Sequence, residues 1–152
     1  MKLFLLRHGD ASFAAHSDCE RPLTDYGRGQ IHQVVTRVTS KLSSTPVLLT
    51  SPKLRARQTA EIAQSILLAN EASITEHLKP CSELVDLGKL IDRHNDNDLL
   101  LVTHQPLVGD LLDYLIDMPG TGRLMGTGCF AALDLITFGR GCGTLEWLEA
   151  PS

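Results

Sequence analysis

The stretch that decides the fold is Met1-Lys2-Leu3-Phe4-Leu5-Leu6-Arg7-His8-Gly9. Its first six residues form an apolar run typical of a short buried strand, and the run ends directly in a cation, an imidazole and a glycine. Open α/β sheets bind ligands at the carboxyl ends of their strands. The stretch therefore predicts a buried strand that delivers Arg7 and His8 to a ligand site.

Two later apolar runs lead to the same kinds of side chain. One is followed by a helix-start pattern at residues 51–52, with Ser51 as the expected cap, and then by Arg55. The other, residues 99–103, is the most apolar run of the chain and ends at His104. Two histidines and two arginines that each follow a strand indicate a phosphate site with a histidine nucleophile.

Predicted strands and helices alternate along the first three quarters of the chain. Thr24 and Ser82 are expected to cap two of the helices. The pattern then changes to two strands, residues 129–138 and 144–149, joined by a glycine-rich turn. We expect one domain over residues 1–152, an α/β fold built as a three-layer α/β/α sandwich, with a mainly parallel central sheet and an antiparallel edge.

The amino-acid composition excludes several classes of protein. Hydrophobic residues make up 43% and charged residues 21% of the chain, as in globular proteins. The net charge of -4 argues against a nucleic-acid binder that relies on overall basicity, so an anion site must be a local cluster of cations. No apolar run approaches the roughly 18 residues that cross a membrane, and the first run is too short for a signal peptide. We therefore expect a cytoplasmic protein with four reduced cysteines and no membrane partner.

Four segments together resemble the histidine phosphatase superfamily, which includes the phosphoglycerate mutases. They are Arg7-His8-Gly9, Arg21-Pro22-Leu23-Thr24-Asp25-Tyr26-Gly27, Ser51-Pro52-Lys53-Leu54-Arg55-Ala56-Arg57-Gln58-Thr59 and Leu101-Val102-Thr103-His104-Gln105-Pro106. Within the superfamily, the short chain, the Arg-Pro-Leu-Thr variant and residues 104–109 are similar to the SixA-type phosphohistidine phosphatases. The resemblance implies a phosphoglycerate mutase-like fold.

The resemblance also implies roles for four residues. His8 would attack phosphorus and become phosphohistidine, while Arg7, Arg55 and His104 would bind the phosphoryl oxygens. The residue types fit, because phosphoryl transfer depends mostly on positioning and on charge stabilisation, which arginine supplies. The nucleophile must be neutral, whereas His104 is expected to stay protonated when a bound dianion compensates. No metal and no cofactor are implied, since the cationic side chains replace them.

The general acid is not identified by the sequence. Larger members of the superfamily use a carboxylate from a segment after the Arg55-type helix, and the usual motif is missing here. Glu83 is the nearest carboxylate and is one candidate for the general acid. The alternative is that Glu83 is a first-turn helix residue favoured by the helix dipole. Asp18 is a second candidate for the general acid. The alternative is that Asp18 is a surface residue of a loop without a catalytic role. Arg21 is expected near the rim, where it contacts substrate or forms a structural ion pair.

The missing general-acid motif and the short interval between Arg55 and His104 favour a phosphorylated protein as the substrate. An alkoxide leaving group benefits strongly from a proton donor. Imidazole, whose conjugate acid has a pKa of about 6.5, depends on a proton donor much less. Larger members of the superfamily carry an inserted helical lid between the counterparts of Arg55 and His104, and the interval here is short. The resemblance therefore implies a shallow, open site that a phosphorylated side chain of another protein could enter. We expect a metal-independent phosphatase that removes phosphate from phosphohistidine on a phosphorelay or phosphotransfer protein and releases inorganic phosphate. The alternatives are a broad or small-molecule phosphomonoesterase and a non-catalytic phosphoprotein-binding module.

Overall fold

A computed structural model describes residues 1–152, with strands and helices in the expected alternation. The strands are β1 (Lys2–Arg7), β2 (Val47–Thr50), β3 (Ser73–Ile74), β4 (Leu99–Thr103), β5 (Phe130–Leu135) and β6 (Gly143–Glu149). The helices are α1 (Asp25–Val38), α2 (Leu54–Leu67), α3 (Leu84–Arg93) and α4 (Leu107–Ile116). None of these helices combines the length and the apolarity needed to cross a bilayer.

All six strands form one sheet in the order β3-β2-β4-β1-β5-β6. The pairs β1–β4, β2–β4 and β2–β3 are parallel, whereas β5 runs antiparallel to both β1 and β6. Every residue of β4 is buried, as expected for a central parallel strand covered on both faces. The mainly parallel sheet with an antiparallel edge is confirmed.

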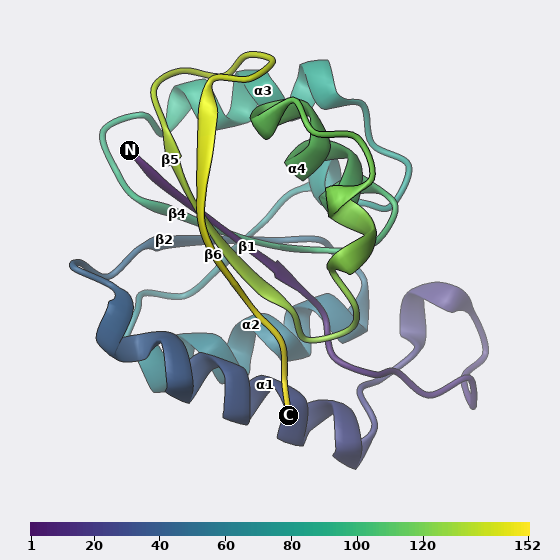
Figure 1. The fold of residues 1–152 in the computed structure, drawn as a ribbon. Coiled ribbons are helices and arrows are strands. Elements are labelled where there is room, and N and C mark those ends of the chain that lie inside the picture. The colour runs from purple at the N-terminus through teal and green to yellow at the C-terminus, as the bar shows by residue number, and fades with distance from the viewer.

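Helices cover both faces of the sheet. Figure 1 shows α1 and α2 on one face and α3 and α4 on the other. Side chains of β1 alternate between the two sides: Leu3 and Leu5 join the core under α3 and α4, while Phe4 and Leu6 join the core under α1 and α2. The three-layer α/β/α sandwich is therefore confirmed. It places the carboxyl ends of β1, β2 and β4 along one edge.

The predicted helix caps are right at one position and wrong at two. The hydroxyl oxygen of Thr24 accepts a hydrogen bond from the Gly27 amide at 2.9 Å and caps α1. Ser51 does not cap α2, because the helix begins only after Lys53, which is the N-cap residue; the Ser51 hydroxyl is bonded to a histidine ring. Ser82 does not cap α3 either, since its hydroxyl donates to a carbonyl oxygen of the preceding turn.

The first turn of α1 approaches the backbone beyond β1 so closely that it requires glycine. A Cβ atom at Gly27 would lie 2.1 Å from the carbonyl oxygen of Asp10, whereas a Cβ at Gly29 would have no neighbour within 4 Å. We expect Gly27→Ala to lower the free energy of unfolding by about 1–3 kcal/mol. Gly29→Ala, the matched control, should leave stability unchanged or raise it by up to about 1 kcal/mol. Urea denaturation of both variants checks this, and equal stabilities would contradict it.

Candidate active site

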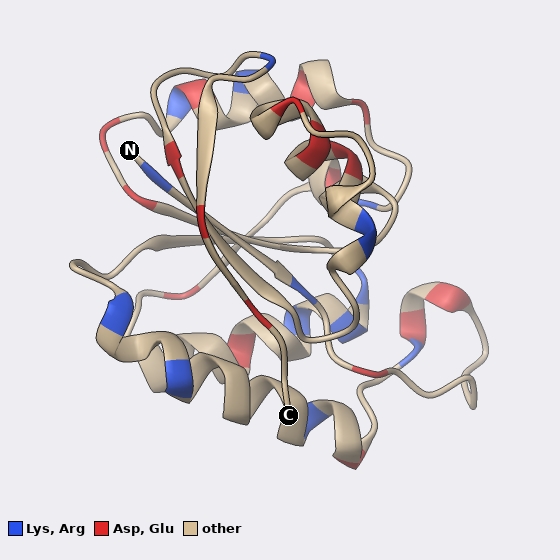
Figure 2. Ribbon diagram, in the orientation of Figure 1, with Lys and Arg blue, Asp and Glu red and all other residues tan.

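Two histidines and an arginine meet where the parallel strands end. Arg7 pairs with Thr103 at the ends of β1 and β4, so His8 and His104 emerge side by side, with ring centroids 5.0 Å apart. The first turn of α2 adds Arg55, whose Nε donates a hydrogen bond to His8 Nε2 at 3.4 Å. Figure 2 shows the basic residues gathered between the end of β1 and the start of α2. Three segments far apart in the sequence thus form one site.

These residues line a cavity of about 360 Å³. Its walls are formed by Arg7, His8, Asp10, Ala11, Phe13, Arg21, Arg55, His104, Gln105 and Thr127. A larger hollow of about 700 Å³ lies between α1 and the C-terminal residue, but its only basic residue besides an exposed histidine is Arg37. The concentration of cations therefore points to the smaller cavity as the functional one. No group of three or more His, Cys, Asp and Glu side chains is placed to hold a metal ion.

The geometry around His8 leaves the lone pair of its Nε2 atom unprotonated, as a nucleophile requires. The ring lies close to the carbonyl oxygen of Gly9, 2.7 Å from Nδ1, and the carbonyl can only accept, so Nδ1 carries the proton. Nε2 faces the N–H donor of Arg55 and therefore presents its lone pair. Burial, with the charges of Arg55 and Arg7 adding to it, lowers the pKa of His8 to about 4. The ring is neutral at pH 7, as a nucleophile requires.

His104 is buried and presents one ring nitrogen without a protein partner. Its Nε2 lies 2.7 Å from Ser51 Oγ, which accepts a bond from the Lys53 amide and has no other acceptor for its own proton. The Ser51 hydroxyl therefore donates to Nε2, and the ring proton lies on Nδ1. Burial, with His8 and Arg55 adding to it, lowers the pKa of His104 to about 2. A protonated His104 in the presence of a bound dianion stays a prediction.

Two buried donors have no partner within the protein, and both belong to residues that line the cavity. They are His104 Nδ1 and Arg7 Nε. Buried polar groups are nearly always hydrogen-bonded, so unpartnered donors in a cavity wall favour an anionic ligand. Thr59 connects the segment after β1 to α2. Its hydroxyl accepts a hydrogen bond from the Gly9 amide at 3.2 Å and donates one to the Arg55 carbonyl at 2.8 Å. These bonds connect the backbone that follows His8 to the turn of α2 that carries Arg55.

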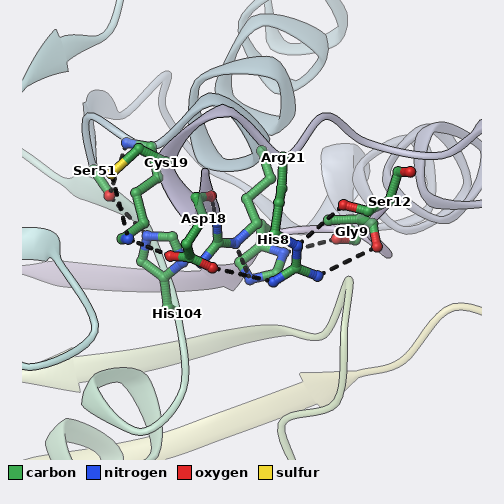
Figure 3. A network of polar contacts seen from close by, with 11 residues as sticks. His8, Gly9, Ser12, Asp18, Cys19, Arg21, Ser51 and His104 are labelled. Carbon is green, nitrogen blue, oxygen red and sulfur yellow. Dashed lines mark hydrogen bonds and ion pairs between the residues drawn. The ribbon is translucent and has the colours of Figure 1, made fainter. Parts of the chain in front are cut away.

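Asp18 is bound to cations rather than free to donate a proton. Its carboxylate contacts Lys53, Arg55 Nη2 at 3.3 Å and Arg21 Nη1 at 3.3 Å (Figure 3). The hydrogen bond with Lys53, aided by the Arg55 charge, holds the pKa of Asp18 well below its usual range. The side chain is not among the residues lining the cavity. A general-acid role for Asp18 does not fit this ionised state.

Arg21 lies in the cavity wall, as expected for a rim residue. Its Nε donates to the Ser12 carbonyl at 3.0 Å, and its guanidinium carbon lies 3.9 Å from the centre of the Phe13 ring. These contacts, with the ion pair to Asp18, hold the guanidinium in place. Both expected roles of Arg21, contact with substrate and structural ion pairing, are compatible with this position.

Glu83 is exposed at the start of α3 and does not line the cavity. The structure instead brings in Asp10, Gln105 and Thr127, which the sequence analysis did not single out. Asp10 and Gln105 could have been found from their positions next to the two histidine motifs. No local signal marks Thr127, because a loop far along the chain carries it to the site.

A neutral histidine, a second histidine and arginines thus lie together at the carboxyl edge of an α/β sheet, the arrangement expected of a histidine-dependent phosphoryl-transfer site. The family model of the histidine phosphatase superfamily (branch 1) matches residues 3–82. The chain belongs to this superfamily.

Named relatives lie within the same superfamily. The phosphohistidine phosphatase SixA of Escherichia coli (strain K12) is 31% identical, over 99% of this chain and 94% of the relative. A phosphohistidine phosphatase SixA homolog of Haemophilus influenzae is 30% identical over 74% of this chain and 75% of its own length. The solved structure of the protein histidine phosphatase SixA complexed with tungstate superimposes with a TM-score of 0.89, covering 99% of this chain and 97% of that one at 31% identity.

The low pKa of His8 has a measurable consequence. An unshifted histidine is half protonated near pH 6.5, whereas His8, with a pKa of about 4, reaches half protonation only near pH 4. We therefore expect the ring signals of His8 to stay constant in an NMR titration from pH 8 down to pH values of about 5, and to move only below that. A midpoint near 6.5 would contradict the buried, arginine-flanked environment.

Proposed function

We propose that this protein is a metal-independent phosphohistidine phosphatase that acts on a phosphorylated protein through a phosphohistidine intermediate on His8. The observation that carries the proposal is the neutral His8 ring, with its Nε2 lone pair in a cavity lined by three arginines. The likeness to SixA over nearly the whole chain supports the substrate class. Tungstate, which the solved SixA structure holds, is a tetrahedral oxyanion like phosphate.

In the first step, His8 Nε2 attacks phosphorus while the bond from phosphorus to the substrate nitrogen breaks. The electron pair of that bond leaves with the substrate imidazole, whose other ring nitrogen carries a proton, so the leaving group departs as neutral imidazole. Positive charge develops on the His8 ring, and the Gly9 carbonyl that accepts from Nδ1–H stabilises it. The donors of Arg7, Arg55 and His104 offset the charge on the phosphoryl oxygens.

In the second step, water attacks the phosphorus of the phosphoenzyme. The bond from phosphorus to Nε2 breaks, and its electron pair restores the neutral ring. Inorganic phosphate is the second product. Because the arginines stay charged throughout, the same donors serve both steps without a proton change.

The leaving group decides between the substrate classes. Neither carboxylate that the sequence suggested as a general acid is suited to protonate an alkoxide: Asp18 is ion-paired, and Glu83 is outside the cavity wall. An imidazole leaving group tolerates this arrangement, because a phosphohistidine protonated on its other ring nitrogen releases a neutral imidazole and needs no proton from the enzyme. The environment of these two residues therefore favours phosphohistidine over an alkyl phosphate.

Glu83 provides a direct check of this reasoning. Since its exposed carboxylate does not line the cavity, we expect Glu83→Gln to change kcat/KM by less than about threefold on a phosphohistidine protein and on p-nitrophenyl phosphate. Parallel steady-state assays of the two substrates measure this. A large loss on both substrates would make Glu83 an essential acid and would overturn its assignment as a helix-start residue.

The test of the proposed function compares two substrates. Phosphate release is measured from a phosphohistidine-bearing phosphotransfer protein and from p-nitrophenyl phosphate at equal enzyme concentration. We expect the phosphohistidine protein to be turned over with the higher kcat/KM. Preferred turnover of the small ester would favour a general phosphomonoesterase, and phosphate binding without turnover of either would favour a binding module.

We also infer the setting in which the protein acts. All four cysteines are free thiols, and two of them, Cys19 and Cys81, are exposed. Exposed free thiols are typical of a reducing compartment, which supports action on cytoplasmic phosphotransfer proteins. We further propose that residues 1–152 act as one domain.

A further inference from the structure

One carboxylate lies close to the nucleophile in the chain and remains without an assigned role. Asp10 is the only acidic residue among those that line the cavity. It follows His8 by two positions, directly beyond the strand that carries the nucleophile. We propose that Asp10 is the general base that activates the water attacking the His8 phosphoenzyme, an inference that rests on the proposed function.

The structure holds Asp10 in place and leaves one oxygen free to accept a proton. Its Oδ2 accepts a hydrogen bond from the Thr24 hydroxyl at 2.7 Å, and its backbone amide donates to Gln30 Oε1 at 2.8 Å. The Asp10 carbonyl accepts from the Thr24 amide at 3.0 Å. Its Oδ1 has no hydrogen-bond or ion-pair partner in the protein. A general base needs this combination of a fixed position and an available lone pair.

The neighbouring groups support a base rather than a purely structural carboxylate. Asp18, the other nearby acid, has both oxygens bound to Lys53, Arg55 and Arg21. Asp10 forms no ion pair, although arginines line the same cavity. A carboxylate placed only to hold the arginines would contact them, as Asp18 does.

The proposed step balances in atoms and charge. As the water oxygen bonds to phosphorus, one water proton passes to Asp10 Oδ1. The bond from phosphorus to His8 Nε2 breaks, and its electron pair returns to Nε2, whose ring keeps the proton on Nδ1. Asp10 then releases the proton to solvent, so that the free enzyme and inorganic phosphate are restored.

The first experiment follows the phosphoenzyme of Asp10→Asn. Enzyme is mixed with a radiolabelled phosphohistidine protein, quenched in alkali and assayed for label on His8. Phosphorylation of His8 should continue, while hydrolysis slows by about a hundredfold, so the phosphoenzyme accumulates and turnover falls. A purely structural role would slow both steps together without accumulation. Hydrolysis of the phosphoenzyme at the wild-type rate would overturn the proposal.

A second variant distinguishes the loss of a general base from a loss of folding. Asp10→Ala removes the carboxylate, and formate supplies one in its place. We expect formate to raise the rate of phosphoenzyme hydrolysis in Asp10→Ala by at least about tenfold and to leave the wild-type rate unchanged. If formate has no effect on this variant in its folded state, as judged by its thermal unfolding, the proposal fails. Absence of a phosphoenzyme on His8 in the wild-type protein would instead contradict the proposed function itself.

Discussion

Replacement of His8 by alanine is expected to lower turnover of a phosphohistidine protein by more than about 10⁴-fold, because it removes the proposed nucleophile, while the Nε2 atom of His104 is hydrogen-bonded to Ser51. Binding of inorganic phosphate should persist, since Arg7, Arg55 and His104 remain. Phosphate release and calorimetric phosphate binding measure the two effects. His32→Ala is the matched control, because His32 is an exposed residue of α1, and it should keep wild-type turnover.

The result that would contradict this prediction is substantial turnover by His8→Ala. Such a result would mean that water attacks the substrate directly, with the histidine pair serving only to bind. A loss of phosphate affinity along with turnover would indicate that the substitution disturbs the cavity as a whole.

Arg55 is expected to give the second largest effect. Its guanidinium donates to His8 Nε2 through Nε and to the Asp18 carbonyl through Nη1 at 2.8 Å, and its side chain is only 6% exposed. Removal of a fixed donor that faces developing charge costs about 10²–10³ in rate. We therefore expect Arg55→Ala to lower kcat/KM by about 10³-fold. Arg55→Lys should recover little, because lysine keeps the charge but loses the planar arrangement of donors.

Arg57 provides the matched control on the same helix. Its Nε donates to the Pro52 carbonyl at 3.0 Å, and it does not line the cavity. Arg57→Ala should therefore change kcat/KM by less than about threefold, as measured in the same assay. Equal losses in the two variants would show that α2 needs positive charge in general rather than a donor at one position.

The fold could be predicted largely because its signals are local. Apolar runs of four to six residues that end at Arg7, Thr50 and His104 mark strands buried on both faces, and such runs are typical of parallel sheets. Parallel strands present their carboxyl ends at one edge, so the residues that follow them must converge. This is why the sequence alone predicts that His8 and His104 lie together.

The parts that could not be predicted depend on contacts between distant segments. Ser51 stands before a proline in a typical helix-start pattern, but the helix begins two residues later, and the Ser51 hydroxyl donates to His104, 53 positions along the chain. Asp18 lies in a loop with no periodic pattern, and its ion pairs with Lys53 and Arg55 arise only when that loop folds over α2. Thr127 reaches the cavity on a loop that follows α4. In each case a tertiary contact decides the role of a residue whose local signal is weak or points elsewhere.

The central claim, turnover through a covalent phosphohistidine on His8, is tested most directly by isolating the intermediate. Enzyme and a radiolabelled phosphohistidine protein are mixed, quenched within milliseconds in alkali, digested and mapped by mass spectrometry. We predict a phosphopeptide that carries the label on His8 Nε2 and loses it in acid, with label appearing before phosphate. Phosphate released without label on His8, or label on a different residue, would contradict the account.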